Sequence, residues 1–372
     1  MMDKGKIIEA LSQIIYPGSN RDIFSMHMIE KLELNENQVN IQLVLPSLES
    51  EHKEELNFAC ISEIQNIYPT AQVNVHLMAR PENFKNTGSN TSPSPNTPNR
   101  LAKNILAVAS GKGGVGKSTV ATNLALALQQ SGAKVGLVDL DLHGPSIPTM
   151  LGLQGQKLKI GKRNGKEGIE PLKIHGISVM SIGLVVAAEK AVVMRGPQLG
   201  SVITEFLTEV HWGDLDYLII DLPPGTGDIH LSLVQTVPVT GVIMVTTPQR
   251  VALADAIKSV NMFRMNPVNV PIIGVIENMS WFTPEEFPDH TYYLFGKGGG
   301  DQLARLFQTK LLGQIPIVQS IREGGDAGQP AVLEEGSITG KYFMDVAKAM
   351  IEQVDKRNEA MPATKLVKVK HH

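Results

Sequence analysis

The chain has 372 residues, of which 42% are hydrophobic and 19% are charged; this composition excludes a wholly disordered chain and, at about 100–200 residues per domain, predicts two or three domains. Its 34 Lys and Arg residues against 37 Asp and Glu residues give a net charge of −3, which provides no electrostatic basis for binding nucleic acid or an anionic membrane. A single cysteine excludes an intramolecular disulfide framework and any zinc or iron–sulfur site built from several cysteines of one chain.

The first fifteen residues, MMDKGKIIEALSQII, form a short amphipathic pattern with acidic residues. A secretory signal would instead carry an apolar core. The sequence also contains no stretch of 18 or more apolar residues, so we expect no transmembrane helix and a cytoplasmic protein.

Residues 1–80 predict a small α+β domain with the element order α-β-β-α-β. Apolar residues recur at helical spacing in two segments and alternate in two others. The helical positions are Ile7, Ile8, Leu11, Ile14 and Ile15, then Leu56, Cys60, Ile64 and Ile67; the alternating ones are Val39, Ile41 and Leu43, then Val73, Val75 and Leu77. Because Cys60 belongs to an apolar stripe, the pattern favours a buried core thiol over a metal ligand.

Residues 81–103 predict a flexible linker, because residues 81–99 read PENFKNTGSNTSPSPNTPN and cannot bury enough apolar surface to fold. A second domain follows over residues 104–362. Five short runs rich in β-branched residues alternate there with segments of helical length, which indicates an α/β fold with a doubly wound, mostly parallel sheet. The runs are 105–109, 135–138, 217–220, 242–245 and 272–276. Residues 363–372 form a basic tail that we expect to fray.

The strongest motif is SGKGGVGKST at residues 110–119, in which residues 111–118 satisfy G-x-x-x-x-G-K-[ST] between an expected strand and an expected helix. Glycines allow backbone N–H groups to surround a β-phosphate, Lys117 supplies a charge to the β- and γ-oxygens, and Ser118 supplies a hydroxyl to Mg²⁺. The motif predicts a P-loop NTPase that binds ATP with Mg²⁺. Its candidate nucleotide-binding residues are Gly111, Lys112, Gly113, Gly114, Val115, Gly116, Lys117, Ser118 and Thr119.

Carboxylates at the ends of two expected strands are candidates for the metal and for the attacking water. Asp221 ends a buried strand and is expected in the outer shell of Mg²⁺. Gly225 follows it and has an N–H that a γ-phosphate would attract, as in a switch. One of the two aspartates Asp139 and Asp141, which end another expected strand, could orient water for hydrolysis, and either could instead cap the next turn. We take Asp141 as the candidate catalytic residue, together with Lys112 and Lys117. His143 and His230 are expected to be surface or hydrogen-bonded residues.

Lys112, directly after the first glycine of the motif, makes the loop resemble the deviant phosphate loop of the dimeric ATPases that include MinD, ParA and the nitrogenase iron protein. In that group this lysine reaches the nucleotide of the partner subunit. The resemblance therefore implies a homodimer in which Lys112 is catalytic. A solvated lysine is the alternative.

Within that group the chain resembles the Mrp/ApbC family of iron–sulfur cluster carriers over residues 104–340. The resemblance rests on DLDLHGPS at 139–146, RGP at 195–197, WGDLDY at 212–217, DLPPGTGD at 221–228, TTPQ at 246–249, ENMS at 277–280 and FG at 295–296. It implies an ATP-hydrolysing carrier that transfers iron–sulfur clusters to apoprotein clients. It also implies that Asn278 lies near the nucleotide base and that Arg322 and Asp326 belong to the loop that closes over it. Residues 1–80 resemble the small assembly domain that is often fused to such carriers.

The chain departs from this family at the Cys-x-x-Cys that usually follows the Asn-Met-Ser segment. Pro284 and Phe287 stand where the two cysteines would be, and neither side chain can bind iron. The nearby acidic residues and histidine are poor ligands for a soft cluster, so a solvated acidic loop is the better interpretation. They are Glu285, Glu286, Asp289 and His290. The iron–sulfur ligands of this chain are therefore unknown.

The alternative hypothesis is a MinD- or ParA-like dimeric ATPase that positions other proteins and carries no cluster. Such proteins need a basic amphipathic membrane helix or a basic face for DNA. The apolar stripe near the end of this chain is instead typical of core packing. It consists of Phe343, Val346, Ala347, Met350, Ile351 and Val354. We therefore expect neither a membrane nor a nucleic acid among the partners.

Overall fold

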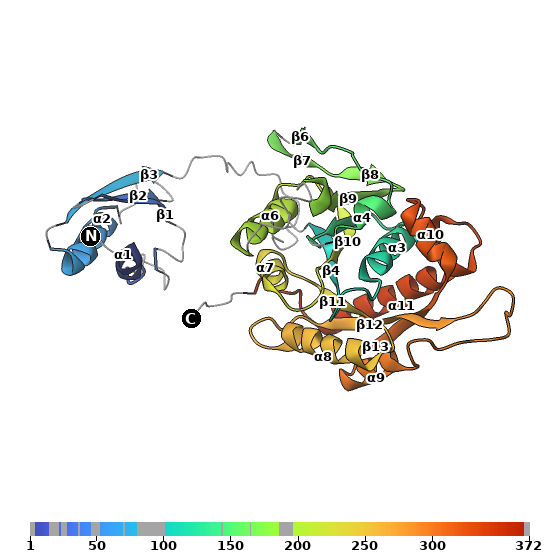
Figure 1. The fold of residues 1–372 in the computed structure, drawn as a ribbon. Helices are drawn as coiled ribbons and strands as arrows, with labels where there is room; N and C mark the ends of the chain where they lie inside the picture. The colour runs from blue at the N-terminus through green and yellow to red at the C-terminus, as the bar shows by residue number, and fades with distance from the viewer. Residues whose placement is uncertain are drawn as a thin grey trace. The chain divides into compact units, whose positions relative to one another are not determined.

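The structure is a computed structural model that describes residues 4–14, 22–23, 28–35, 38–45, 53–69, 71–79, 101–142, 144–163, 165–185 and 196–367. The chain forms two compact units, Met1–Asn96 and Thr97–His372 (Figure 1). The boundary between the units falls inside the segment that the sequence predicts as a linker. Because most of that segment lies outside the described residues, the linker stays a prediction.

The first unit has the element order that the sequence predicts. It contains α1 (Lys4–Leu11), β1 (Ile29–Asn35), β2 (Gln38–Leu45), α2 (Lys53–Ile67) and β3 (Gln72–Ala79). β2 is the central strand of the sheet, antiparallel to β1 and parallel to β3. Parallel neighbours need a crossover connection, and α2 provides it.

The core of the first unit consists of alternate residues of β2 and one stripe of α2. Val39, Ile41 and Leu43 are fully buried, and so is Cys60 on α2. The prediction of a buried core thiol is thus confirmed. Burial raises the pKa of the Cys60 thiol to about 12, so this side chain is not a thiolate at neutral pH.

The second unit is built on an eight-stranded, mostly parallel sheet, which confirms the predicted fold class. Its strands are β4 (Ala102–Ala109), β5 (Val135–Asp139), β8 (Leu172–Ile174), β9 (Ile177–Ser181), β10 (Leu215–Asp221), β11 (Gly241–Thr246), β12 (Ile272–Phe282) and β13 (Lys310–Ile317). Their order is β13-β12-β11-β4-β10-β5-β9-β8, and only β8 runs antiparallel to its neighbour. The five runs expected from sequence are the five neighbouring strands from β12 to β5. Ala102 and Lys103, assigned to the linker from sequence, belong to β4.

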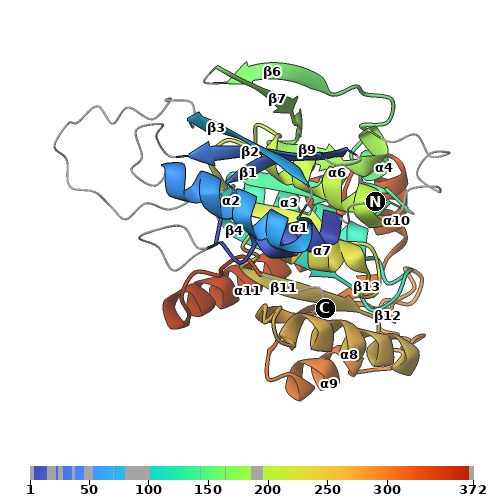
Figure 2. The same cartoon turned by 90° about the vertical axis from the view of Figure 1, so that its left-hand side faces the viewer.

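Helices cover both faces of this sheet (Figure 1). One face packs against α3 (Lys117–Gln130), α4 (Ile147–Met150) and α11 (Ile338–Ala360). The other packs against α6 (Gly196–Thr208), α7 (Asp228–Thr236), α8 (Arg250–Arg264) and α9 (Gly299–Leu306). Figure 1 and Figure 2 both show α8 and α9 next to each other. Strands buried on both faces explain the continuous apolar runs in the sequence.

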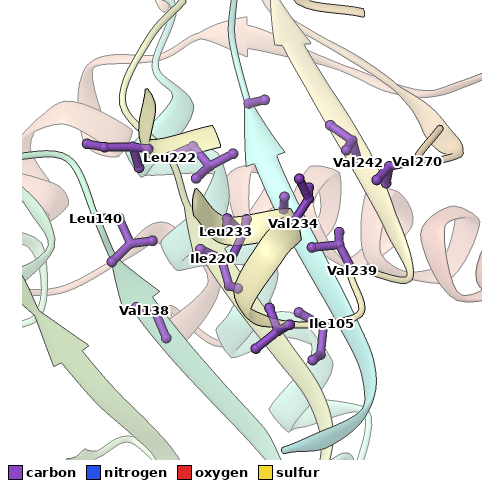
Figure 3. Packing of buried hydrophobic residues seen from close by; sticks show 14 of the residues in the cluster. Ile105, Val138, Leu140, Ile220, Leu222, Leu233, Val234, Val239, Val242 and Val270 are labelled. Atoms are coloured by element: carbon purple, nitrogen blue, oxygen red, sulfur yellow. The ribbon is translucent and has the colours of Figure 1, made fainter. Parts of the chain in front are cut away.

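A dense apolar cluster packs the central strands of the sheet against α7 (Figure 3). Ile105, Val138 and Ile220 come from β4, β5 and β10, and they pack with Leu233 and Val234 of α7. Burying a side chain of this size stabilises a fold by about 1.5–3 kcal/mol. The cluster therefore fixes the positions of three neighbouring strand ends, where the polar residues of the site begin.

Several elements have no counterpart in the sequence-based expectation. The edge strands β8 and β13, and the helix α10 (Gln319–Asp326), are among them. A separate two-stranded antiparallel ribbon consists of β6 (Lys159–Arg163) and β7 (Lys166–Glu170). These segments are short, and their exposed polar residues hide the apolar periodicity by which strands and helices are recognised.

The expectation that the basic tail frays is wrong for residues 363–367. The N–H of Val367 donates to the carbonyl of Val234 at 3.0 Å, and the Val367 side chain is only 8% exposed. Arg357 donates to the hydroxyl of Thr364 at 2.7 Å. One apolar side chain and these hydrogen bonds dock the segment on α7, and residues 368–372 lie outside the described part of the chain.

Most of the apolar stripe of α11 lies in the core, as predicted from its spacing. Phe343, Val346, Ala347, Met350 and Val354 are buried against the sheet. None of the described helices is long and apolar enough to cross a membrane.

Candidate functional site

The phosphate loop (residues 111–119) connects the end of β4 to the start of α3, in the sheet position that the motif requires. Gly114 and Gly116 both have a φ of 79°, a left-handed conformation that favours glycine. Gly111 has no room for a Cβ atom, because the backbone of Asp255 and Ala256 in α8 lies against it. The loop thus packs closely against α8 at its first glycine and leads directly into α3.

Lys117 lies at the centre of a buried cluster of polar side chains. Its Nζ is 2.7 Å from Asp221 Oδ1 and 3.4 Å from Asp141 Oδ2. Ser118 Oγ donates to Asp221 Oδ2 at 2.6 Å. Burial raises the pKa of Asp221, and the charge of Lys117 opposes that rise. The ends of β4, β5 and β10 therefore bring together one cation, two carboxylates and the hydroxyl expected to bind Mg²⁺.

The two aspartates at the end of β5 have different environments. Asp139 is fully buried; its Oδ1 accepts from the N–H of Asp141 at 3.0 Å and its Oδ2 accepts from Ser181 Oγ at 2.8 Å. Burial and the charge of Asp221 raise the pKa of Asp139 to about 7. Asp139 thus supports the turn from within, whereas Asp141 faces Lys117. This geometry supports the choice of Asp141 over Asp139 as the candidate that orients water.

Two adjoining cavities match the two ends of a nucleotide. A cavity of about 240 Å³ is lined by the phosphate loop together with Asp141, Gly144, Ser146, Met150 and Pro224. A second cavity of about 450 Å³ shares Gly116, Thr119 and Met150 with the first. Its remaining lining is mainly apolar and consists of Asn278, Met279, Phe295, Pro316, Ile317, Val318, Ile321, Arg322, Gly325 and Asp326. Sequence reasoning did not identify these apolar residues, because they come from separate elements.

The three residues assigned to the base by resemblance all line the larger cavity. Asn278 is buried at the junction of the two cavities, where its Nδ2 donates to the carbonyl of Val115 at 2.9 Å. The expectation that Arg322 and Asp326 belong to a loop is wrong, because both lie on the helix α10. They pair with each other at 3.1 Å, with side chains 63% and 69% exposed. The structure thus places Asn278 in the wall and the other two at the rim.

Lys112 and Gly225 are held by contacts within the chain. Lys112 Nζ donates to Gln249 Oε1 at 3.3 Å. Lys112 is not one of the described residues that contact the ammonium group of Lys117, which are Ser118, Asp141 and Asp221. The N–H of Gly225 donates to the carbonyl of Ser110 at 2.8 Å. A nucleotide that used the N–H of Gly225 would have to break that hydrogen bond. The contact of Gln249 with Lys112 was not predicted from the sequence, since 137 positions separate the two residues.

Glu277 is a further buried carboxylate that sequence reasoning missed. It is fully buried in the middle of β12, where its Oε2 accepts from the N–H of Gly300 at 2.6 Å and its Oε1 accepts from Gln314 Nε2 at 2.6 Å. Glu277 thus links the first turn of α9 and the strand β13 to β12, next to Asn278. Glu277 belongs to the ENMS motif at 277–280, but its partners Gly300 and Gln314 lie 23 and 37 positions away, so no local pattern indicates its role.

The segment that replaces the family's cysteines is exposed. Phe287 is 59% exposed, and the four acidic or histidine side chains around it are exposed as well, which confirms the expected solvated loop. Figure 1 shows the loop extending outward after β12. Among the described residues, no group of three or more His, Cys, Asp or Glu side chains is placed to hold a metal ion. His143 and Arg195 lie outside the described residues.

The doubly wound sheet, the phosphate loop and the carboxylates around Lys117 define a P-loop nucleotide-binding protein. The family described as NUBPL iron-transfer P-loop NTPase matches residues 101–351, and the family described as iron–sulfur cluster assembly protein matches residues 4–77. The chain belongs to the iron-transfer P-loop NTPases, with an iron–sulfur assembly domain in front.

Similar proteins include a relative named as an iron–sulfur cluster carrier and two solved nucleotide-bound structures. The iron–sulfur cluster carrier protein of Synechocystis is 39% identical and covers 95% of this chain and 98% of its own length. A solved nucleotide-binding protein from Archaeoglobus fulgidus, in complex with ADP, is 36% identical with a TM-score of 0.56 and covers 66% of this chain and 93% of its own. MinD from Pyrococcus horikoshii with Mg-ADP has a TM-score of 0.50, 23% identity and coverage of 69% and 99%, which shows the fold alone. The positioning-ATPase alternative is thus not favoured.

The buried pair of Lys117 and Asp221 predicts a specific loss of stability. Lys117→Ala leaves the Asp221 carboxylate buried without its partner, so we expect the free energy of unfolding to fall by about 3–5 kcal/mol. Urea unfolding followed by tryptophan fluorescence measures this, because Trp212 and Trp281 both belong to the second unit. Lys348→Ala, at an exposed position of α11, is the matched control.

The loss should also depend on pH. Without Lys117, burial holds the pKa of Asp221 further above its unfolded value, so the folded variant binds more protons than the unfolded one. Its stability therefore rises, relative to the wild type, as pH falls toward the unfolded carboxyl pKa. A deficit that stayed constant between pH 8 and pH 5 would contradict this account.

Proposed function

We propose that this protein is an ATP-hydrolysing carrier that binds iron–sulfur clusters and transfers them to apoprotein clients. The observation that supports the nucleotide half is the meeting of Lys117, Ser118, Asp141 and Asp221 beside the phosphate cavity. The cargo half is supported by family membership and by relatives named as carriers over almost the whole chain.

Lys117 is the residue that exchanges partners when a nucleotide binds. A triphosphate presents more negative charge than a carboxylate, and charge-assisted hydrogen bonds strengthen with charge. The ammonium group therefore moves from Asp141 and Asp221 to the β- and γ-oxygens. The N–H groups of the phosphate loop and of the first turn of α3 bind the same phosphates.

The residues around Lys117 fit Mg²⁺. The Ser118 hydroxyl and the Asp221 carboxylate are hard oxygen donors that lie within 2.6 Å of each other, and the carboxylates of the cluster outnumber the single ammonium group. Mg²⁺ favours few protein ligands together with phosphates and water, so Ser118 would bind it directly and Asp221 through its outer shell. The ion, when bound, neutralises charge on the phosphates.

Asp141 is the residue that orients the attacking water, and it lies at the wall of the phosphate cavity. Its contact with Lys117 in the present structure is released when the lysine turns to the phosphates. Gly225 completes the γ-phosphate contacts after its N–H leaves Ser110. Asn278, Arg322 and Asp326 enclose the base in the apolar cavity.

A homodimer completes the site through Lys112. This side chain pairs with Gln249. It is not needed for the β- and γ-phosphates of its own subunit, because Lys117 binds those. Its charge is thus available to the nucleotide of a facing subunit, which would give each hydrolytic site one lysine from the partner copy.

The cluster ligands come mainly from outside the chain. A homodimer has two cysteines, both at position 60, and each is buried with its pKa raised to about 12. Four thiolates, the usual set for a cluster, are therefore not available from the dimer. External thiols, such as glutathione or client cysteines, would supply the missing ligands, and the expected cytoplasmic location stays a prediction.

Asp141→Asn tests the proposed role of the carboxylate. Removing the group that orients water should lower kcat for ATP by about 100-fold or more, while the Kd for ATP changes less than about threefold, since the amide keeps the shape of the cavity. Steady-state turnover and equilibrium binding measure the two quantities. Asp345→Asn, on the exposed side of α11, is the control; a loss of affinity with unchanged turnover per bound ATP would assign Asp141 to binding instead.

Lys112→Ala tests the dimer. The variant should bind ATP with a Kd within about threefold of the wild type, because its own phosphates are served by Lys117. It should not form the ATP-dependent dimer, since the charge that crosses the interface is gone. Light scattering with a non-hydrolysable ATP analogue reports the mass, with Lys348→Ala as the matched lysine control. A wild-type protein that stayed monomeric with the analogue would reject the dimer.

Anaerobic cluster reconstitution tests the source of the ligands. Without added thiol, the wild type and Cys60→Ser should both retain little tightly bound iron, because Cys60 is buried. Added glutathione should raise the iron and sulfide content of both to the same extent. Tight loading of the wild type without thiol, lost in Cys60→Ser, would show instead that Cys60 is a ligand.

A further inference from the structure

His230 is a buried histidine that the proposed chemistry does not use. It lies in the first turn of α7, two residues after Asp228, and its side chain is fully buried. Its ring packs against Phe263 of α8, with centroids 5.8 Å apart and planes tilted by 56°. The sequence predicts a surface or hydrogen-bonded histidine, and the structure bears out only the hydrogen bond, at one of the two ring nitrogens.

The two ring nitrogens have different surroundings. Nδ1 lies 3.3 Å from the carbonyl oxygen of Gly227, and because a carbonyl only accepts, Nδ1 carries the proton. Nε2 is buried and makes no hydrogen bond with any described residue. Burial lowers the pKa of His230 to about 4, although the carbonyls of Gly227 and Pro223 act in the opposite direction. The ring is therefore neutral at pH 7, and in the tautomer with the proton on Nδ1, which the Gly227 carbonyl favours, Nε2 is an acceptor without a hydrogen-bond donor in the described part of the chain.

His230 also lies two residues after the end of the segment that has to move if a γ-phosphate binds to the N–H of Gly225. This segment, residues 223–228, is fastened by Gly225, whose N–H donates to Ser110 at 2.8 Å and whose carbonyl accepts from Ser259 Oγ at 3.4 Å. The Gly227 carbonyl accepts from both the N–H of His230, at 3.1 Å, and its ring. A buried acceptor without a partner is unfavourable, so an arrangement of the segment that supplied a donor to Nε2 would be favoured.

We propose that His230 is a positioning residue that couples residues 223–228 to the γ-phosphate, its Nε2 accepting a hydrogen bond from this segment once the N–H of Gly225 has left Ser110. The donors available are the main-chain N–H groups of residues 226 and 227 and the Thr226 hydroxyl, since the N–H of Gly225 is assigned to the γ-phosphate and the two prolines carry no N–H. The inference rests on the proposed binding of ATP. The imidazole then stabilises the arrangement of residues 223–228 in which a γ-phosphate is bound. In the nucleotide-free arrangement, Nε2 has no hydrogen-bond donor among the residues that the structure describes.

Three substitutions at this position separate the two nitrogens. His230→Asn places an amide nitrogen near the position of Nδ1 and has no group at that of Nε2. His230→Gln reaches the Nε2 position with an amide oxygen that can accept. His230→Phe keeps the ring and removes both nitrogens. Phe263→Leu is the control for packing, because it removes the ring contact and leaves both nitrogens in place.

The measurement is the Kd for ADP and for a non-hydrolysable ATP analogue, each with Mg²⁺, on the full chain. ADP has no γ-phosphate and does not require the segment to move. We expect the ratio of the two affinities to fall about tenfold in His230→Asn and His230→Phe, and to stay within about threefold of the wild type in His230→Gln and Phe263→Leu. The Kd for ADP should change less than about twofold throughout.

Thermal unfolding of the nucleotide-free variants provides a second readout. His230→Phe should have a Tm equal to or above that of the wild type, because the volume is kept and the unsatisfied acceptor is removed. An unchanged affinity ratio in His230→Asn and His230→Phe would overturn the proposal, and so would a ratio lowered as much in His230→Gln as in His230→Phe. Failure of the wild type to bind either nucleotide would instead reject the proposed function itself.

Discussion

The burial of the Lys117 ammonium group between the carboxylates of Asp141 and Asp221 is the constraint on which the rest of the site depends. Removing charges from water costs several kcal/mol per ion, and only close, well-oriented partners offset that cost. The ends of β4, β5 and β10 therefore have to meet at one place, and the apolar contacts between these strands and α7 fix them there. The same arrangement makes the lysine responsive to a ligand, because it holds partners that a phosphate can replace.

The central part of this fold and site could be predicted from the sequence, because local rules determine it. The phosphate loop lies within ten residues, and Asp221 ends a run that is apolar on both faces. The partners that complete the site could not be predicted. Lys112 contacts Gln249 and Ser181 contacts Asp139 across 137 and 42 positions, and such pairs depend on how helices and strands pack. Edge strands such as β8 were missed because a short, partly exposed strand carries too few apolar residues to show a period.

The side chains suited to a nucleotide and those suited to an iron–sulfur cluster are very unequally represented in this chain. Phosphates and Mg²⁺ are served by residues of the second unit, which supplies the oxygen and nitrogen groups that they favour. The chain offers almost no thiolate ligands for a soft cluster. Its one cysteine is buried in the first unit, and the segment after β12 carries carboxylates and aromatic rings. If external thiols supply most of the cluster ligands, as proposed, we expect this carrier to release its cargo easily, because few of the bonds to the cargo would belong to the protein.

The docking of residues 363–367 on α7 has a practical consequence for handling the protein. Val367 covers part of the apolar surface of α7 and donates to Val234, near the end of the helix that begins at the segment around Gly225. A truncated chain that stops after α11 would uncover this surface, and a bulky fusion joined directly at residue 367 would pull on it. An affinity handle attached beyond a long spacer at the carboxyl-terminal end avoids pulling directly on Val367.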